Sequence, residues 1–324
     1  MRFLRYISAI LLVAASSAAA SGQSLTSMRF RPQWTAQAQF AGYYVAAEKG
    51  FFKEEGIALQ IDHLPLNSTE SSLDALLRGD VDVISNQLIP SIVARSQGHK
   101  IVNILQVSQN SALMCVSHSP ITAPDVLHGH RVGRWKSGFH ELAEIFFNDE
   151  HVEVEWVPFI RSINLFVSGA VDATLCYSYS EYFELLLAMG EINPICTMRF
   201  SELGYNIPED GVYVTEQYYN SPKELLAGFA RAVRKGWDYA REHREEALDI
   251  VMREIEKNNV SSNRYMQKLM LDEILRLQLN PITSEYDYAP VDVTLYDYLQ
   301  KGLVSNGNIK APVEYGSLIK TFED

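Results

Sequence analysis

Short β-like runs alternate with helical runs along the first 90 residues of the chain. The pattern predicts strands over 28–32, 58–63 and 81–85, and helices over 41–53 and 71–77. Strands that alternate with helices are joined by crossovers, which places neighbouring strands parallel and covers the sheet with helices. The sequence therefore predicts an α/β fold with largely parallel sheets.

Two short segments resemble each other and indicate an internal repeat. Residues 76–84 read Leu-Leu-Arg-Gly-Asp-Val-Asp-Val-Ile, and residues 167–175 read Val-Ser-Gly-Ala-Val-Asp-Ala-Thr-Leu. In both, a glycine follows an apolar helix, where a left-handed residue closes helices, and a Val-Asp pair then opens a strand. We expect Asp82 and Asp172 to bind local backbone groups at these strand starts.

A second similarity has the same meaning. A strand, a tryptophan, a polar loop and a helix follow one another at 28–53, with Trp34, and again at 131–147, with Trp135. The two similarities together predict two related α/β lobes. The C-terminal third reads as helices over 221–237, 265–279 and 293–303, without a low-complexity linker, so we expect crossovers between packed lobes.

The charge balance and the N-terminus limit the classes of function. The formal charge is −12, which argues against a general nucleic-acid-binding protein. Arg2 and Arg5 precede an apolar run at 7–15 and small residues at 18–20, which is typical of a secretory signal peptide over 1–20. The alternative, a membrane anchor, needs a longer apolar run of about 20 residues. We expect a periplasmic protein without a lipid anchor, because no cysteine follows the cleavage site.

Motifs for catalysis and cofactor binding are missing from the sequence. It contains no phosphate-binding glycine loop, no His-Glu-x-x-His and no Gly-x-Ser-x-Gly. Cys115, Cys176 and Cys196 match no metal-site spacing; a Cys176–Cys196 disulfide is the alternative to buried free thiols, which we favour. We expect no catalytic residue, no metal and no cofactor.

Aromatic and amide side chains follow the predicted strands. Ligands in open α/β sheets bind beyond the carboxyl ends of strands, so these positions predict a binding cleft. Trp and Tyr faces there suit a flat polar heterocycle, amides can read its ring nitrogens, and Glu181 can accept from an amino group. The alternative for each residue is an ordinary place in the core. The candidates are Trp34, Gln37, Gln39, Phe40, Tyr43, Asn67, Asn86, Gln87, Trp135, Ser137, Gly138, Tyr177, Tyr179 and Glu181.

Several motifs resemble the periplasmic binding proteins of the thiamine-pyrimidine type, which serve ABC importers. The resemblance covers nearly all of the chain after the signal peptide. It is carried by Gln-Phe-Ala-Gly-Tyr-Tyr-Val-Ala at 39–46, Lys-Gly-Phe-Phe-Lys-Glu-Glu-Gly-Ile at 49–57, Arg-Val-Gly-Arg-Trp at 131–135, Ser-Tyr-Ser-Glu-Tyr at 178–182 and Glu-Asp-Gly-Val-Tyr-Val-Thr at 209–215. It implies ligand contacts from the candidates above, and it adds Asp210 to them.

The resemblance also implies a type II periplasmic binding protein fold. In this fold two α/β lobes enclose a ligand cleft, and here a helical C-terminal tail is expected to pack across lobe 1. With crossovers near 112–117 and 204–213, lobe 1 would comprise 27–112 plus 207–324, and lobe 2 would comprise 113–206. The implied function is capture of a small heterocycle, a thiamine-precursor pyrimidine or similar molecule, by hinge closure of a monomer, and delivery to ABC importer membrane subunits.

The sequence departs from relatives in ways that bear on this function. Ser180 stands where relatives usually have Asn, and Phe40 stands where the pyrimidine-synthase branch has His. The cysteine-rich iron loop of the synthases is also missing. A synthase-like enzyme on the same fold is therefore the weaker alternative, and a sensory binding module for a membrane receptor is another.

Overall fold

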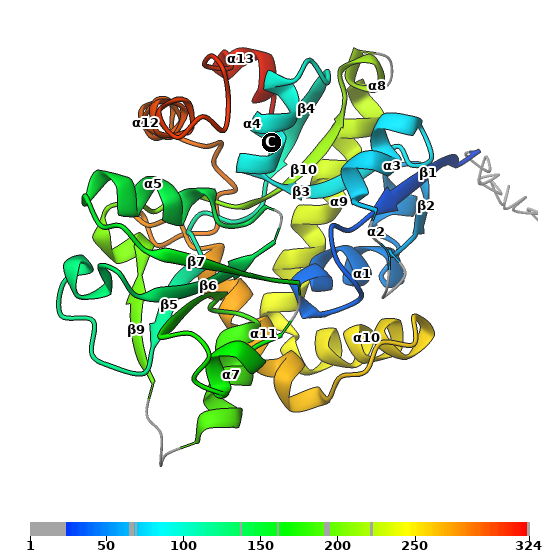
Figure 1. Cartoon of the computed structure of the whole chain (residues 1–324). Coiled ribbons are helices and arrows are strands. Elements are labelled where there is room, and N and C mark those ends of the chain that lie inside the picture. The colour runs from blue at the N-terminus through cyan, green and yellow to red at the C-terminus, as the bar shows by residue number, and fades with distance from the viewer. Residues whose placement is uncertain are drawn as a thin grey trace, which may run out of the picture.

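The computed structural model describes residues 24–64, 68, 70–136, 138–160, 162–190, 195–220 and 223–322, so the predicted signal peptide lies outside the described residues. Two α/β lobes lie side by side, each built on a five-stranded sheet (Figure 1). The strand order in lobe 1 is β2 (Ile57–Ile61), β1 (Thr26–Arg31), β3 (Val83–Gln87), β10 (Asp210–Thr215) and β4 (Ile101–Gln106). The strand order in lobe 2 is β7 (Glu155–Phe159), β6 (Arg131–Trp135), β8 (Ala173–Tyr177), β5 (Leu113–Ser117) and β9 (Cys196–Arg199).

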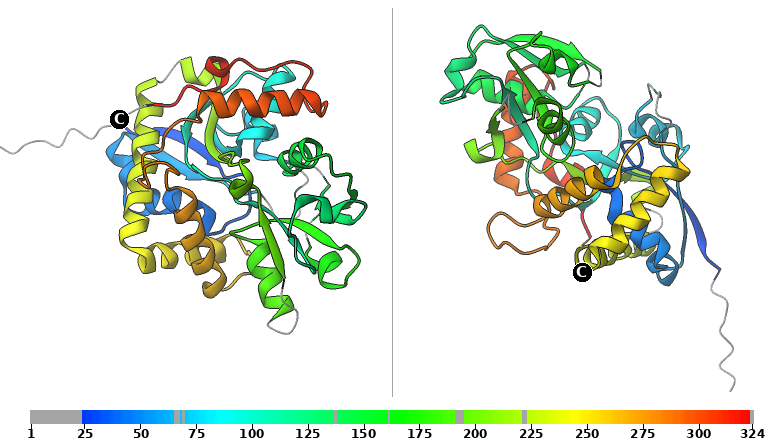
Figure 2. Two further views of the ribbon diagram at one scale, coloured as in Figure 1. Left: turned by 90° about the vertical axis from the view of Figure 1, so that its left-hand side faces the viewer. Right: turned by 90° about the horizontal axis from the view of Figure 1, so that it is seen from below.

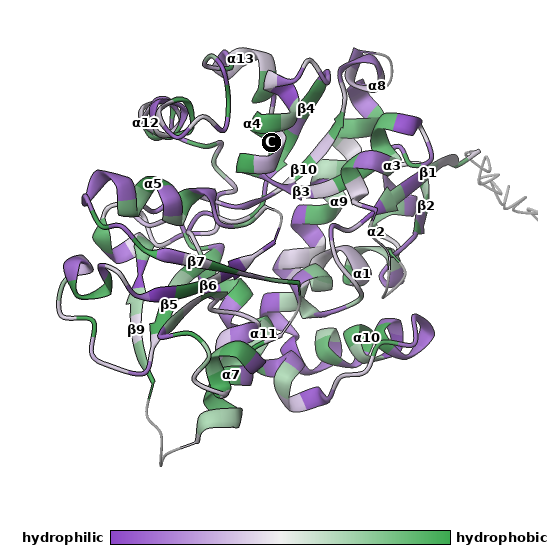
Figure 3. Ribbon diagram, in the orientation of Figure 1, coloured by the Kyte–Doolittle hydropathy of each residue, from purple (hydrophilic) through white to green (hydrophobic). Residues whose placement is uncertain are grey.

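Helices cover both sheets, and hydrophobic residues gather on the strands and on one face of the surrounding helices (Figure 3). The helices of the first half are α1 (Ala41–Glu48), α2 (Phe51–Glu54), α3 (Ser72–Arg78), α4 (Leu88–Ser96), α5 (Glu141–Asp149), α6 (Asn164–Val167) and α7 (Glu181–Met189). Those of the C-terminal part are α8 (Glu216–Asn220), α9 (Lys223–Glu242), α10 (Arg244–Lys257), α11 (Arg264–Leu277), α12 (Val293–Ser305) and α13 (Tyr315–Leu318). None of the helices in the described ranges is long and apolar enough to cross a membrane.

The two sheets have equivalent strand orders, but they are mixed rather than largely parallel. In each, one strand runs antiparallel to both neighbours: β10 between β3 and β4, and β5 between β8 and β9. These two strands carry the chain between the lobes and therefore enter each sheet from the opposite direction. Every strand of a sheet falls within one of the lobes that the sequence predicts, and we keep those boundaries as our proposal.

Equivalent aspartates confirm the internal repeat in atomic detail. The Asp82 carboxylate accepts from the backbone N–H of Arg29 at 2.8 Å, and the Asp82 N–H donates to the Arg29 carbonyl at 2.9 Å. Asp172 forms the same pair of bonds with Arg131, both at 2.9 Å. The partner backbone belongs to the adjacent strand, so Asp82 connects β3 to β1 and Asp172 connects β8 to β6.

A close helix contact anchors the C-terminal part on lobe 1. Helix α9 packs along α1, and Trp237 is fully buried against Tyr43 at this contact. A Cβ atom at Gly236 would lie 2.1 Å from the carbonyl oxygen of Gly42, so the two backbones touch. Only glycine allows this approach.

The tail reaches both lobes, whereas the resemblance implied packing across lobe 1. Helix α12 lies against α5 of lobe 2 (Figures 1 and 2). The Tyr298 hydroxyl donates to the Asp149 carboxylate at 2.8 Å, and Gly302 faces Ile145 at a distance that leaves no room for a Cβ atom. Helix α13 lies against β4 of lobe 1, so the tail spans the two lobes.

The three cysteines are free thiols. Cys176 of β8 lies opposite Met114 on one side of β5, and Cys196 of β9 lies opposite Ser117 on the other side of β5. Two strand spacings, about 9.6 Å, therefore separate their strands, which is too far for a disulfide.

Candidate ligand-binding site

A cavity of about 770 Å³ opens between the lobes. This volume lies in the upper half of the range for small-molecule sites, about 300–1,000 Å³. Its walls come from the loop after β1 (33–39), from the strand ends and α7 of lobe 2, and from 260–270 at the start of α11.

The lobe 1 wall presents one aromatic ring and several amides. Trp34, Gln37 and Gln39 lie on the loop after β1, and Gln87 ends β3. Trp34 is half-buried and packs edge-on against Phe139 of lobe 2, with ring centroids 6.3 Å apart. The Gln37 side-chain amide donates to the side-chain oxygen of Gln39 (Oε1) at 2.6 Å, which fixes the orientation of both side chains.

The lobe 2 wall is a stack of aromatic rings. Trp135 stacks on Tyr177 at 5.1 Å between ring centroids, and Tyr177 stacks on Tyr179 at 5.4 Å with an interplanar angle of 9°. Phe139 meets the edges of Trp135 and Tyr177. Its φ of 67° is left-handed and directly follows the left-handed Gly138, and this unusual backbone turns the ring into the cleft. Stacked walls of this kind favour a planar ligand.

Polar contacts across the cleft join the two walls. The Tyr177 hydroxyl donates to the side-chain oxygen of Gln87 (Oε1) at 3.1 Å, and the Gln39 side-chain amide donates to the Tyr179 hydroxyl at 3.3 Å. All four side chains line the cavity, so closure of the lobes and the shape of the cavity are coupled.

Two carboxylates lie in the cavity wall. Glu181 accepts from the Tyr177 backbone N–H at 3.2 Å and from the Ser180 hydroxyl, both through Oε2. Its other oxygen is therefore available to a ligand N–H group. Glu184, one turn later on α7, lines the outer part of the cavity. Acceptors at these positions suit amino or imide groups on the ligand.

Asp210 lies behind the lobe 1 wall and outside the lining of the large cavity. Its carboxylate accepts from the Gln33 amide at 2.8 Å and from the Gln39 amide at 2.6 Å. Burial raises the pKa of Asp210, while these amide bonds oppose the rise. The residue acts on the site through Gln39, whose side chain it orients.

The structure places the other candidates away from the cavity lining. Phe40 and Tyr43 are 1% and 2% exposed and belong to the lobe 1 core. Tyr43 packs on Phe30 of β1 and Trp237 of α9, and Phe40 packs on His63 after β2. The Asn86 amide donates to Ser91 at 2.9 Å, and Gly138 supplies the turn before Phe139. We leave these four residues out of the proposed site. The candidates Asn67 and Ser137 lie outside the described residues.

Sequence reasoning missed several lining residues. The notable case is Phe139: the helix expected at the end of the 131–147 segment begins at Glu141, so Phe139 precedes it and lines the cleft. The wall from 260–270 includes Asn263, Met266 and Met270, and Gln267 joins it to the loop after β1 by accepting from the Ala38 N–H at 2.6 Å. Their positions within a helical tail resemble ordinary core periodicity, and no local signal marks them as cleft residues.

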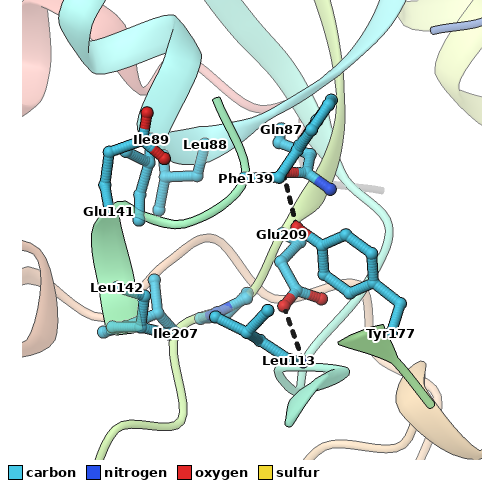
Figure 4. A pocket seen from close by; sticks show the side chains of 11 residues that line it. Gln87, Leu88, Ile89, Leu113, Phe139, Glu141, Leu142, Tyr177, Ile207 and Glu209 are labelled. Atoms are coloured by element: carbon cyan, nitrogen blue, oxygen red, sulfur yellow. Dashed lines mark hydrogen bonds between the residues drawn. The ribbon is translucent and has the colours of Figure 1, made fainter. Parts of the chain in front are cut away.

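A second, small cavity of about 20 Å³ lies beside the crossovers (Figure 4). Gln87, Tyr177 and Glu209 converge on it. The Glu209 carboxylate accepts from the backbone N–H of Ala112 at 2.9 Å and from the Ser111 hydroxyl at 2.7 Å. Glu209 therefore links the two crossover segments at the hinge.

The hinge carboxyl group predicts a pH-dependent stability. Burial raises the pKa of Glu209 from 4.5 to about 8, so the folded protein holds a proton that the unfolded chain releases. The contribution to stability is therefore present below about pH 4.5 and is lost as pH rises from about 4.5 to 8. We expect Glu209→Gln to flatten this fall in thermal unfolding curves. Glu224→Gln, at a 90% exposed side chain, is the control and should retain it; equal slopes in the two variants would contradict the prediction.

A family model described as "NMT1/THI5 like" matches residues 37–247, about two thirds of the chain. The chain belongs to the NMT1/THI5-like family. The match includes most of lobe 1 and all of lobe 2, and it ends before the wall formed by 260–270. This wall and residues 33–36 of the loop after β1 therefore lie outside the part of the site that the family model covers.

Two curated proteins are similar in sequence to this NMT1/THI5-like chain. The riboflavin-binding protein RibY of Chloroflexus aurantiacus is 23% identical over 285 residues, which cover 85% of this chain and 80% of RibY. The formylaminopyrimidine-binding protein of Halalkalibacterium halodurans is 26% identical over 294 residues, which cover 86% of this chain and 87% of that protein.

Solved structures confirm the fold of this NMT1/THI5-like protein. The periplasmic aliphatic sulphonate binding protein SsuA of Escherichia coli has a TM-score of 0.68 at 16% identity, covering 90% of this chain and 96% of SsuA. The alkanesulfonate-binding SsuA of Xanthomonas axonopodis pv. citri has a TM-score of 0.65 at 12% identity, covering 91% and 98%. The predicted two-lobe periplasmic binding protein fold is confirmed.

Proposed function

We propose that this protein is an extracytoplasmic solute-binding protein that captures a flat, polar heterocycle and delivers it to an ABC importer. The observation that carries the proposal is the aromatic stack of Trp135, Tyr177 and Tyr179 facing Trp34 across one cavity. Amides and the Glu181 carboxylate surround these rings, so both the faces and the polar edges of a heterocycle find partners.

The volume of the cavity favours a fused-ring ligand of the flavin class. About 770 Å³ exceeds what a single six-membered ring fills, and the third wall, at 260–270, adds polar and methionine side chains to the lining. A relative named for riboflavin binding supports this choice. The second candidate is a single-ring aminopyrimidine, which the formylaminopyrimidine-binding relative favours.

Capture follows from contacts that both lobes make with one ligand. A ligand that touches Trp34 on lobe 1 and the Trp135 stack on lobe 2 binds the closed arrangement more tightly than an open one. It therefore shifts the population toward closure, by as much as its difference in affinity for the two states. The side chains of Gln87 and Tyr177 already meet across the cleft and complete the closed arrangement.

The other elements of the proposal come from the sequence and the relatives. The signal peptide that we predict over 1–20 would direct the protein to the periplasm. Binding without catalysis agrees with relatives that are named as binding proteins. We keep the proposal of a monomer. A pyrimidine synthase would need the cysteine-rich iron loop that the sequence lacks, and a sensory module would use the same cavity with a receptor as partner.

The proposal is tested by native mass spectrometry of the secreted protein and by thermal unfolding with riboflavin, a thiamine-precursor aminopyrimidine and an alkanesulfonate. At a ligand concentration of 100 Kd, we expect riboflavin to stabilise the fold by about 2.7 kcal/mol, which raises Tm by about 4 °C or more. A shift with the pyrimidine alone would select the second candidate. No shift with either heterocycle would contradict the proposed ligand class, and co-purified iron would favour the synthase.

A further inference from the structure

The loop after β1 carries much of the lobe 1 wall, and a buried histidine holds it. His63 follows β2 and is 8% exposed. Its Nδ1 lies 3.0 Å from the carbonyl oxygen of Trp34, and its Nε2 lies 2.8 Å from the hydroxyl oxygen of Tyr44 on α1. The imidazole therefore contacts both the loop that presents Trp34 and the helix that follows this loop.

Hydrogen-bond chemistry fixes the direction of these contacts. A carbonyl oxygen only accepts, so Nδ1 of His63 carries the proton and donates to Trp34. In a neutral imidazole Nε2 is then an acceptor, and it accepts a hydrogen bond from the Tyr44 hydroxyl. A chain of two hydrogen bonds, from Tyr44 to His63 and from His63 to Trp34, thus connects α1 to the loop that presents Trp34.

We propose that His63, which Tyr44 holds through Nε2, is the positioning residue for Trp34, and that protonation of His63 weakens ligand binding. The inference rests on the proposed function for its effect on affinity, although the effect on Trp34 itself does not require a ligand. Protonated His63 carries hydrogen on both nitrogens, so Nε2 no longer accepts from Tyr44. The Tyr44 hydroxyl loses its acceptor, and the loop loses one of its connections to α1.

The groups around His63 set the pH at which its imidazole becomes protonated. The rings of Phe40 and Tyr44 pack against the imidazole from α1 and the residue before it. Burial lowers the pKa of His63 below 6.5, and the Lys257 charge on α10 lowers it further. The Trp34 carbonyl, Glu254 on α10 and Asp62 beside His63 oppose this shift. The neutral form therefore prevails at pH 7, and affinity is expected to fall as pH decreases through a value below 6.5.

The test follows the indole N–H signal of Trp34 by NMR in the ligand-free protein. The chain has four tryptophans, and the signal that disappears in Trp34→Phe identifies Trp34. In the wild type we expect this signal to move with pH at an apparent pKa below 6.5. His63→Phe keeps the ring volume but removes both hydrogen bonds, so it should shift the signal and abolish the titration. His63→Asn retains a donor near Nδ1 and should restore the position without the titration.

Binding of riboflavin, measured by fluorescence quenching, is the second readout. We expect about a tenfold loss of affinity in His63→Phe and in Tyr44→Phe, and less than about threefold in His63→Asn. His118→Phe is the matched control, because His118 contacts the Phe166 carbonyl at 2.9 Å on lobe 2, outside the cavity lining. A Trp34 signal that keeps its wild-type position and still titrates in His63→Phe would overturn the positioning role. Absence of riboflavin binding in the wild type would count against the proposed ligand class alone.

Discussion

Gly236→Ala is expected to lower Tm by about 8 °C. The added Cβ would lie 2.1 Å from the Gly42 carbonyl oxygen and 2.8 Å from the Ala46 Cβ, so one backbone has to move. Overpacking in a core lowers the free energy of unfolding by about 1–3 kcal/mol and occasionally more. Because this clash is with backbone, we expect a loss of about 4 kcal/mol. At about 2 °C per kcal/mol for a chain of this size, the shift is about 8 °C.

The direction of the change in Tm distinguishes the packing clash, which lowers stability, from helix propensity, which would raise it. Alanine is intrinsically about 1 kcal/mol better than glycine inside a helix, so propensity alone predicts stabilisation. Gly316→Ala on α13 is the control, because a Cβ there meets nothing within 4 Å. Thermal unfolding of both variants measures the difference. If Gly236→Ala were as stable as Gly316→Ala, the contact of α9 with α1 would be looser than the structure describes.

Trp34→Ala is expected to reduce riboflavin affinity by about thirtyfold with little loss of stability. Trp34 is half-buried and lines the cavity, so the variant removes an aromatic face from the ligand rather than from the core. Aromatic anchors of this kind contribute about 2 kcal/mol or more, which corresponds to about thirtyfold in Kd. Isothermal titration calorimetry measures the affinity, and circular dichroism checks the fold.

Trp135 needs a different substitution. It is 5% exposed and stacks on Tyr177, so Trp135→Ala would leave a void in lobe 2 and destabilise it by about 3–5 kcal/mol. Trp135→Phe keeps most of this packing and should weaken binding about tenfold. Trp156→Ala is the matched control, since Trp156 packs on Phe147 outside the cavity lining. Equal affinity in Trp34→Ala, Trp135→Phe and Trp156→Ala would refute the aromatic cleft.

Much of the architecture could be read from local patterns. The alternation of strands and helices, and the repeated Gly and Asp residues, predicted two related lobes, because each depends on contacts within one or two adjacent elements. Gly79 and Gly169 are left-handed as expected. Parallel pairing was overestimated, because the direction of the crossover strands depends on where the chain crosses between lobes rather than on the residues of β5 and β10.

The candidate site divides in the same way. Trp34, Trp135 and Tyr179 were identified because residues at strand ends gather at one edge of a sheet. Phe40 and Tyr43 were placed with them by the same rule, yet both rings are buried where the chain enters α1. Sequence position near a strand end therefore selects a neighbourhood, and helix geometry decides which of its residues face the cavity.

What the amino-acid sequence determined by itself was the class of fold and the aromatic, amide-rich chemistry at the strand ends, since both follow from short-range periodicity. Tertiary structure alone decided the third wall at 260–270, the left-handed turn that places Phe139 in the cleft, and the contact of His63 with Trp34. The third wall and the His63 contact join residues far apart along the chain, so they exist only once the helices have docked and the strands have paired. Long-range packing, which no local pattern encodes, therefore completes the site.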